Sequence, residues 1–174
     1  MAMTFTRPGP RTRGAQVLAE FLPLHEEHAP QGFGLRPEAA VLQVADHVGD
    51  AARLACDEGS SPMLAAVPLT WAAATALAAV PRLRGASDVP AARAKDELLL
   101  EIDRAARARL ERAESWSSAE LVTHVQAALG PAFAALAEAE REPATEGAGQ
   151  MADALLETAT WSVVAAEVLE ARAT

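Results

Sequence analysis

The sequence predicts an all-α protein, a bundle of five to six helices of which some are kinked by proline. Hydrophobic residues make up 51% of the 174 residues, which is enough for a sizeable core, and most of them are alanine and leucine. Aromatic residues, which favour β-strands, make up only 4% of the chain. Alanine, leucine, glutamate and arginine are strong helix formers, and together they dominate the chain.

Residues 1–12 are expected to form a disordered tail, and residues 13–174 a single all-α helical domain. The tail carries prolines and a glycine but no apolar period. It also lacks the apolar segment of a signal peptide, and the chain has a single cysteine. These features favour a cytoplasmic protein without a disulfide.

The first helix is expected over residues 13–22 and is expected to end at Pro23, since an interior proline loses one backbone hydrogen bond and clashes with the preceding turn. His25 and His28 would then be solvated residues beyond the helix. The alternative is a kinked helix that continues past Pro23 and turns both histidines inward. The second helix is expected to begin at Pro37 and to end near Gly59.

Residues 62–80 predict a buried helix, because alanines surround Trp71 and Leu77 on all sides. Pro68 is expected to interrupt this helix or to begin a new one. The segment is apolar enough to raise the question of a membrane span, but its proline and its short length favour a buried position.

The fourth helix is expected to run from the Asp88–Pro90 region to about Glu114. Its buried stripe consists of Leu98, Leu99, Ile102, Ala106, Leu110 and Ala113. Opposite charges four residues apart are expected to face solvent on its other side: Arg93–Glu97, Asp103–Arg107 and Arg107–Glu111.

Ser117 and Glu120 have the spacing of a capping box, which predicts the start of the fifth helix. Its expected buried face is Leu121, Val125, Leu129, Phe133 and Leu136, with a kink at Pro131. The last helix, over residues 150–171, has two apolar stripes. Such a helix is either central in the bundle or part of a subunit interface, so a homodimer is the expected self-association.

The formal net charge of −9 and the isoelectric point near 4.9 disfavour nucleic acid and anionic membranes as partners, because both require a basic surface. Three histidines, His25, His28 and His47, are candidate acid–base residues, since imidazole changes charge near neutral pH. Phe21, Trp71 and Trp161 are candidate ligand-binding residues, because alanine-rich helices leave room that aromatic side chains can line.

The stretch PEAAVLQVADHVGDAARLA, residues 37–55, resembles the first metal-binding helix of MazG-type nucleotide pyrophosphohydrolases, which has the pattern L-x-x-x-E-E-x-G-E. Asp46, His47 and Asp50 stand at its acidic positions and Gly49 at its glycine. The family is all-α, usually oligomeric, and cleaves nucleoside triphosphates with magnesium. The resemblance covers residues 15–83 and implies that Asp46 and Asp50 bind Mg²⁺. Pro68 and Trp71 stand where the second helix of the family carries Glu-x-x-Asp, so the metal motif is degenerate.

The favoured hypothesis is a small-molecule-binding helical bundle protein, either a metal-independent acid–base enzyme or an accessory protein of small-molecule metabolism. It needs no cofactor. One alternative is a degenerate MazG-like, Mg-dependent nucleotide pyrophosphohydrolase. The other alternative is a non-catalytic homo-oligomeric interaction protein. Whether the protein is an enzyme is left open by the sequence.

Overall fold

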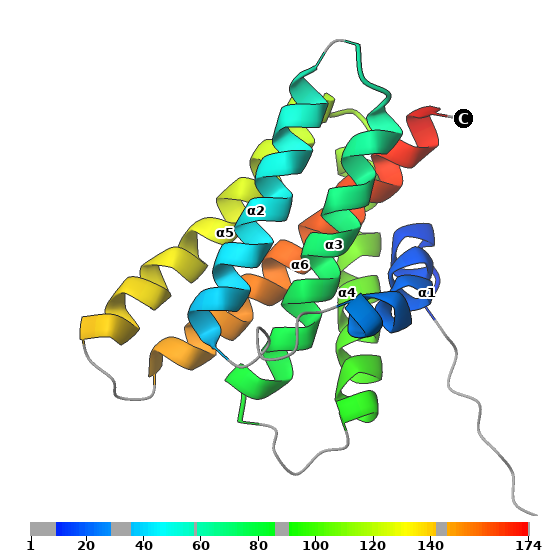
Figure 1. The fold of residues 1–174 in the computed structure, drawn as a ribbon. Helices are drawn as coiled ribbons and strands as arrows, with labels where there is room; N and C mark the ends of the chain where they lie inside the picture. The colour runs from blue at the N-terminus through cyan, green and yellow to red at the C-terminus, as the bar shows by residue number, and fades with distance from the viewer. Residues whose placement is uncertain (1–9, 29–35, 58, 86–90, 142–145, 174) are drawn as a thin grey trace, which may run out of the picture.

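The computed structural model describes residues 10–28, 36–57, 59–85, 91–141 and 146–173. These ranges contain six α-helices and no strand, so the all-α prediction is confirmed (Figure 1). The helices are α1 (Arg13–His28), α2 (Pro37–Cys56), α3 (Pro62–Leu83), α4 (Ala91–Ala113), α5 (Ser118–Arg141) and α6 (Glu146–Ala173).

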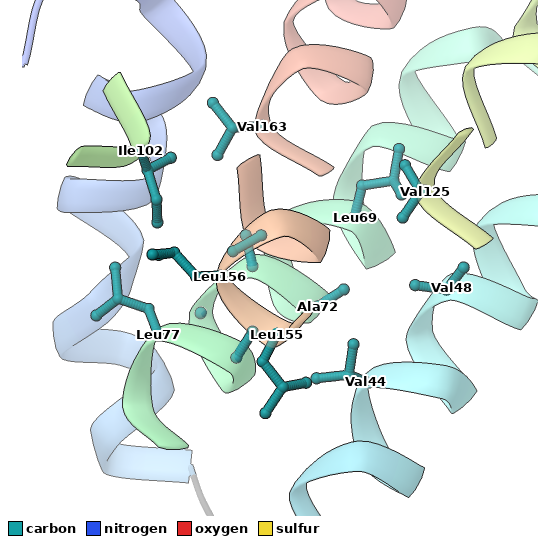
Figure 2. Packing of buried hydrophobic residues seen from close by; sticks show 14 of the residues in the cluster. Val44, Val48, Leu69, Ala72, Leu77, Ile102, Val125, Leu155, Leu156 and Val163 are labelled. Atoms are coloured by element: carbon teal, nitrogen blue, oxygen red, sulfur yellow. The ribbon is translucent and has the colours of Figure 1, made fainter. Parts of the chain in front are cut away.

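Helix α6 is the central helix of the bundle, because it contacts each of the other five helices. In Figure 1 it passes behind α2 and α3, and its most extensive contacts are with α3 and α5. Figure 2 shows Leu155, Leu156 and Val163 of α6 meeting the apolar side chains of neighbouring helices. Both of its apolar stripes are therefore covered within one chain, as the central-helix interpretation requires.

Helix α3 forms the other half of the core. Seven of its thirteen buried residues are alanine, which lets its backbone lie close to that of α6. The expected interruption at Pro68 is wrong, since the helix runs without a break through this buried proline and through Pro81. Its length and composition would suit a membrane span, but 61% of the apolar window is buried inside the bundle.

Helix α1 also passes through its proline, so the expectation that it ends at Pro23 is wrong. The proline ring is exposed, and residues on both sides of it are tied to other helices. His25 bonds to Thr75 of α3, and Glu26 pairs with Lys95 of α4. These long-range contacts hold the turn that the missing backbone hydrogen bond would otherwise weaken.

Asp103 of α4 fixes the start of α1. Its Oδ1 accepts hydrogen bonds from the backbone N–H of Arg11 at 2.9 Å, and from the N–H and the hydroxyl of Thr12 at 2.8 and 2.9 Å. The expected position of Asp103 on the solvent side is wrong, because only 2% of the residue is exposed. Residues 11 and 12, which the sequence assigns to the expected tail, are thus hydrogen-bonded to α4.

The pKa of Asp103 lies below its ordinary value. Burial alone would raise this pKa, but the hydrogen bonds from Thr12 and Arg11 and the charge of Arg107 outweigh that effect. The predicted Asp103–Arg107 pair is present, with 3.4 Å between Oδ2 and the guanidinium nitrogen Nη2. The carboxylate is therefore ionised, and it is a permanent acceptor for the first residues of α1.

Gly14 allows α1 to approach α6 closely. Its N–H donates to Glu167 Oε2 at 2.8 Å. A Cβ at this position would lie 2.7 Å from the carbonyl oxygen of Val163 and 2.9 Å from its Cγ1. Any larger residue would force the two helices apart.

The predicted capping box at the start of α5 is confirmed. The N–H of Ser117 donates to Glu120 Oε2 at 2.7 Å, and the N–H of Glu120 donates to Ser117 Oγ at 3.2 Å. The helix then continues through Pro131. The expected burial of Phe133 is wrong, since 40% of it is exposed and the small residues Ala132 and Ala135 face the core instead.

Candidate functional site

Four of the residues singled out in the sequence meet in one place, where α1, α2 and α3 come together. We call this group, with Thr75, the histidine–tryptophan cluster: Phe21, His25, His47, Trp71 and Thr75. The Phe21 ring meets the Trp71 ring edge to face, with centroids 4.7 Å apart. The His25 and His47 rings lie 5.6 and 5.9 Å from the Trp71 ring, and His47 is stacked on it.

His25 is the most deeply buried titratable group of the cluster, with 4% of the residue exposed. Its Nε2 lies 3.1 Å from Thr75 Oγ1, and its Nδ1 is buried without a hydrogen-bond partner among the described residues. Burial lowers the pKa of His25, the nearby His47 and Lys95 lower it further, and Glu26 opposes them. His25 is therefore neutral at neutral pH.

His47 approaches the cluster from α2 and resembles His25 in its electrostatics. Its Nε2 is buried, and no partner for it is found in the described part of the chain. Burial lowers the pKa of His47, and the carboxylates of Asp46 and Asp50 partly oppose this effect. The cluster thus holds two neutral imidazoles, each with one buried nitrogen that bonds to no described protein group.

A groove of about 960 Å³ lies on the outer face of α2 and shares His47 with this cluster. Its described lining consists of residues of α2 and the residue before it: Arg36, Glu38, Ala39, Leu42, Gln43, Ala45, Asp46, His47, Gly49 and Asp50. His47 belongs both to the groove and to the buried cluster. It therefore stands where a small molecule in the groove would first meet the buried nitrogens.

Lys95 and Glu26 form an ion pair at the side of the cluster that faces α4. Sequence reasoning missed both residues and also Thr75. A polar residue four positions after Trp71, in a helix otherwise almost wholly apolar, was the available signal for Thr75. No local pattern marks Lys95, because its place near His25 depends on how α4 packs.

The structure does not bring His28 into the cluster. Its side chain is exposed, and its Nδ1 lies 2.8 Å from the carbonyl oxygen of Leu24 in the preceding turn. A spacing of three residues places His25 and His28 on neighbouring parts of the helix surface, but His28 is the last residue of α1 and is exposed, so only His25 reaches α3.

Trp161 lies in a second group, the tryptophan–arginine cluster, which consists of Arg109, Arg112, Trp116, His124 and Trp161. Trp116 stacks on His124 at 3.9 Å and on Trp161 at 5.5 Å. Guanidinium groups cover the two indoles, that of Arg109 at 4.9 Å and that of Arg112 at 5.3 Å from the ring centres. Its rings contact one another, so this cluster ties the end of α4 and the start of α5 to the middle of α6.

Asp46 and Asp50, the residues that the MazG-like resemblance assigns to Mg²⁺, are exposed on the outer face of α2. Asp50 forms an ion pair with Arg53 at 2.8 Å. Across the described residues, no group of three or more His, Cys, Asp or Glu side chains is arranged to hold a metal ion. The magnesium role of these two carboxylates stays a prediction.

Comparison with known proteins assigns no function to this site, so its geometry is the basis for interpretation. No protein-family model, no curated protein and no solved structure matches this chain.

Proposed function

We propose that this protein binds a small molecule at the histidine–tryptophan cluster and uses His25 and His47 as hydrogen-bonding and acid–base groups. The observation that carries the proposal is a pair of buried imidazole nitrogens beside Trp71, His25 Nδ1 and His47 Nε2, that have no described hydrogen-bond partner. Buried polar groups are nearly always hydrogen-bonded, so each such atom calls for an explanation.

The energetic argument favours a ligand or an ordered water at this place. A buried donor or acceptor without a partner costs roughly 1–3 kcal/mol, and a group that satisfies both nitrogens recovers that free energy. Phe21 and Trp71 supply apolar surface beside them. A neutral imidazole can accept a proton at one nitrogen and release one at the other, which is the chemistry of a metal-independent acid–base enzyme.

The proposal is tested by screening small molecules against the protein with imidazole ¹H–¹⁵N spectra. We expect binders to shift the signals of His25 and His47 together and to leave those of His28 unchanged. Replacing His47→Phe should abolish these shifts, whereas the matched exposed replacement, His28→Phe, should retain them. If no compound perturbs His25, His47 or Trp71, the proposed site is wrong.

The MazG-like alternative predicts a different result in a parallel assay. Incubation with a panel of nucleoside triphosphates and Mg²⁺ should give turnover that Asp46→Asn and Asp50→Asn remove and that His25→Phe leaves intact. Turnover of this kind would replace the acid–base proposal. Its absence in the wild-type protein would remove the alternative.

Self-association is a second candidate role, and one observation favours it. Met63, Leu64 and Val67, near the start of α3, are each more than half exposed, at 55, 51 and 53%. We propose that a second copy of the chain covers this apolar surface. Light scattering after size exclusion tests this: a dimer that Leu64→Glu converts to a monomer supports it, and a wild-type monomer rejects it.

A further inference from the structure

Thr75 differs from the other buried threonines within helices for which a hydrogen bond is described. The hydroxyls of Thr70, Thr158 and Thr160 each donate to the carbonyl oxygen four residues earlier, at 3.1, 2.7 and 2.9 Å. For Thr75, the described side-chain hydrogen bond is the one with His25 Nε2. Its hydroxyl therefore bonds to a residue of α1, whereas the hydroxyls of the other three bond within their own helices.

This bond determines which nitrogen of His25 carries the proton. If Thr75 donates to Nε2, both of those atoms are satisfied and the ring proton lies on Nδ1. If Nε2–H donated to Thr75 instead, the hydroxyl proton and Nδ1 would both lack a described partner. The first arrangement leaves fewer unsatisfied groups, so His25 offers a buried Nδ1–H donor to the cluster.

His47 offers the complementary group. Its Nε2 is the nitrogen that is buried without a partner, whereas Nδ1 is not sequestered in this way. We assign the proton of His47 to Nδ1, because the Nε2 lone pair then faces inward as an acceptor and complements the Nδ1–H of His25. One donor and one acceptor thus lie beside Trp71, near enough to each other that His47 lowers the pKa of His25, and a single hydroxyl group between the two rings can satisfy both.

The charges around the entrance favour an uncharged molecule. Three carboxylates, of Glu38, Asp46 and Asp50, and one guanidinium, of Arg36, line the groove, so the excess of negative charge opposes the entry of an anion. The cost of burying an unpaired charge also opposes a cation. The nearest cation to His25, Lys95, is already paired with Glu26. Phe21 and Trp71 present apolar faces for the body of the ligand.

We infer that the ligand is a small uncharged molecule with an apolar body and a hydroxyl group that accepts from His25 Nδ1–H and donates to His47 Nε2. This inference rests on the function proposed above, and it names the class of molecule that the site takes. A phenol is the simplest example, since its ring can lie against Trp71 while its hydroxyl lies between the two imidazoles.

Three probes that share a benzene ring test the inference: phenol, anisole and benzoate. Binding is followed by imidazole ¹H–¹⁵N shifts at a pH above 6.5, the ordinary pKa of histidine. Phenol should bind at least about tenfold tighter than anisole, which cannot donate to His47, because one buried hydrogen bond is worth roughly that factor. Benzoate should bind more weakly than phenol.

Thr75→Val provides the decisive variant, and Thr70→Val is its matched control. Both remove one buried hydroxyl from α3, but only Thr75 bonds to His25. We expect Thr75→Val to weaken phenol binding about tenfold and to move the His25 ring proton from Nδ1 toward Nε2 in the ¹⁵N spectrum. Thr70→Val should leave both unchanged.

The outcomes separate this inference from the proposed function. If anisole or benzoate shifts His25 and His47 and binds as tightly as phenol, the site exists but the hydroxyl class is wrong. If Thr75→Val leaves phenol binding and the His25 tautomer unchanged, the assignment of Nδ1–H is wrong. If none of the probes perturbs the cluster and the wider screen also finds no binder, the proposed function fails with it.

Discussion

Among the described residues, four side-chain atoms are buried without a hydrogen-bond partner: His25 Nδ1, His47 Nε2, Arg109 Nη1 and Ser162 Oγ. The two histidine atoms lie beside Trp71, and His47 also lines the groove on α2, so both suit a ligand. Ser162 is different, because it lies in the middle of the central helix with no exposed surface. Its hydroxyl is best explained as a local cost to stability.

Ser162→Ala should therefore leave the free energy of unfolding unchanged or raise it by about 1 kcal/mol, because it removes an unsatisfied buried hydroxyl. Thr158→Val on the same helix is the control, and it should lower stability, since the Thr158 hydroxyl donates to the carbonyl oxygen of Ala154 at 2.7 Å. Urea denaturation measures both. A hydrogen bond contributes about 1 kcal/mol to stability. If Ser162→Ala lowers the free energy of unfolding by about that amount or more, Ser162 Oγ has a hydrogen-bond partner.

The two neutral imidazoles also make stability depend on pH. In the folded state burial holds the pKa of His25 and His47 below the ordinary 6.5, which both regain on unfolding. The unfolded chain therefore binds more protons as the pH falls below 6.5, and the free energy of unfolding decreases there. The slope is at most about 1.4 kcal/mol per pH unit for each histidine.

The double variant His25→Gln, His47→Gln should flatten this slope between about pH 6.5 and 5, whereas the exposed His28→Gln should keep it. Asp103 acts in a separate range, because its lowered pKa makes its contribution fall only at pH values below the ordinary 3.8. Denaturation at a series of pH values measures the slope. An unchanged slope in the double variant would contradict the neutral, buried state of these rings.

At the scale of the helices, α1 is held by its contacts with other helices. Asp103 accepts from the residues that start it, Glu167 accepts from Gly14, and Thr75 and Lys95 hold its second half. Without these ties, an interior proline would disfavour the last turn. Helix α1 is therefore the element whose position depends most on single polar contacts.

Asp103→Asn should detach the start of α1 and lower the free energy of unfolding by roughly 2–4 kcal/mol, because the replacement weakens three hydrogen bonds to a buried charge. The exposed Asp96→Asn, on the same helix α4, is the matched control and should change stability by less than about 0.5 kcal/mol. Hydrogen exchange adds a local measurement, since only Asp103→Asn should speed exchange in α1. Equal protection of α1 in both variants would contradict this role.

The sequence predicted the start of a helix correctly where the residues that determine it are neighbours in the chain. The capping box of Ser117 and Glu120 involves neighbouring residues, and it was found correctly. The course of α1 past Pro23 depends on Thr75 and Lys95, which are distant in the chain, so local rules gave the wrong end. Phe133 was misplaced because a four-residue step drifts around a helix, and Ala132 holds the buried position.

For the whole molecule, the central position of α6 means that its side chains are shared by the entire bundle. Leu155→Ala should lower stability by roughly 2–5 kcal/mol, as expected for a fully buried leucine. Leu42→Ala is the control with the same chemical change on exposed surface, and it should cost less than about 0.5 kcal/mol. Thermal unfolding followed by circular dichroism measures both. Similar losses in the two variants would contradict the central place of α6.

The candidate site shows the same division between local and global information. Phe21, His25, His47 and Trp71 could be singled out by residue type, but their meeting point could not be predicted, because three different helices contribute them. Trp161 has the same chemistry as Trp71 and lies in the other cluster. The sequence alone did not distinguish the two tryptophans, since helix packing decides which one meets the histidines.

The alanine-rich face of α3 has a consequence for how this gene tolerates mutation. A single-base change in an alanine codon gives valine, threonine, serine, proline, glycine, aspartate or glutamate, and all of these except glycine are larger than alanine. At Ala72, Ala73 or Ala76, where no surface is exposed, most such changes would crowd α3 against its neighbours, at a cost of typically about 1–3 kcal/mol. Natural variation in this core should therefore be rare at the alanines and more frequent at leucine or valine positions, where exchange among apolar residues preserves volume.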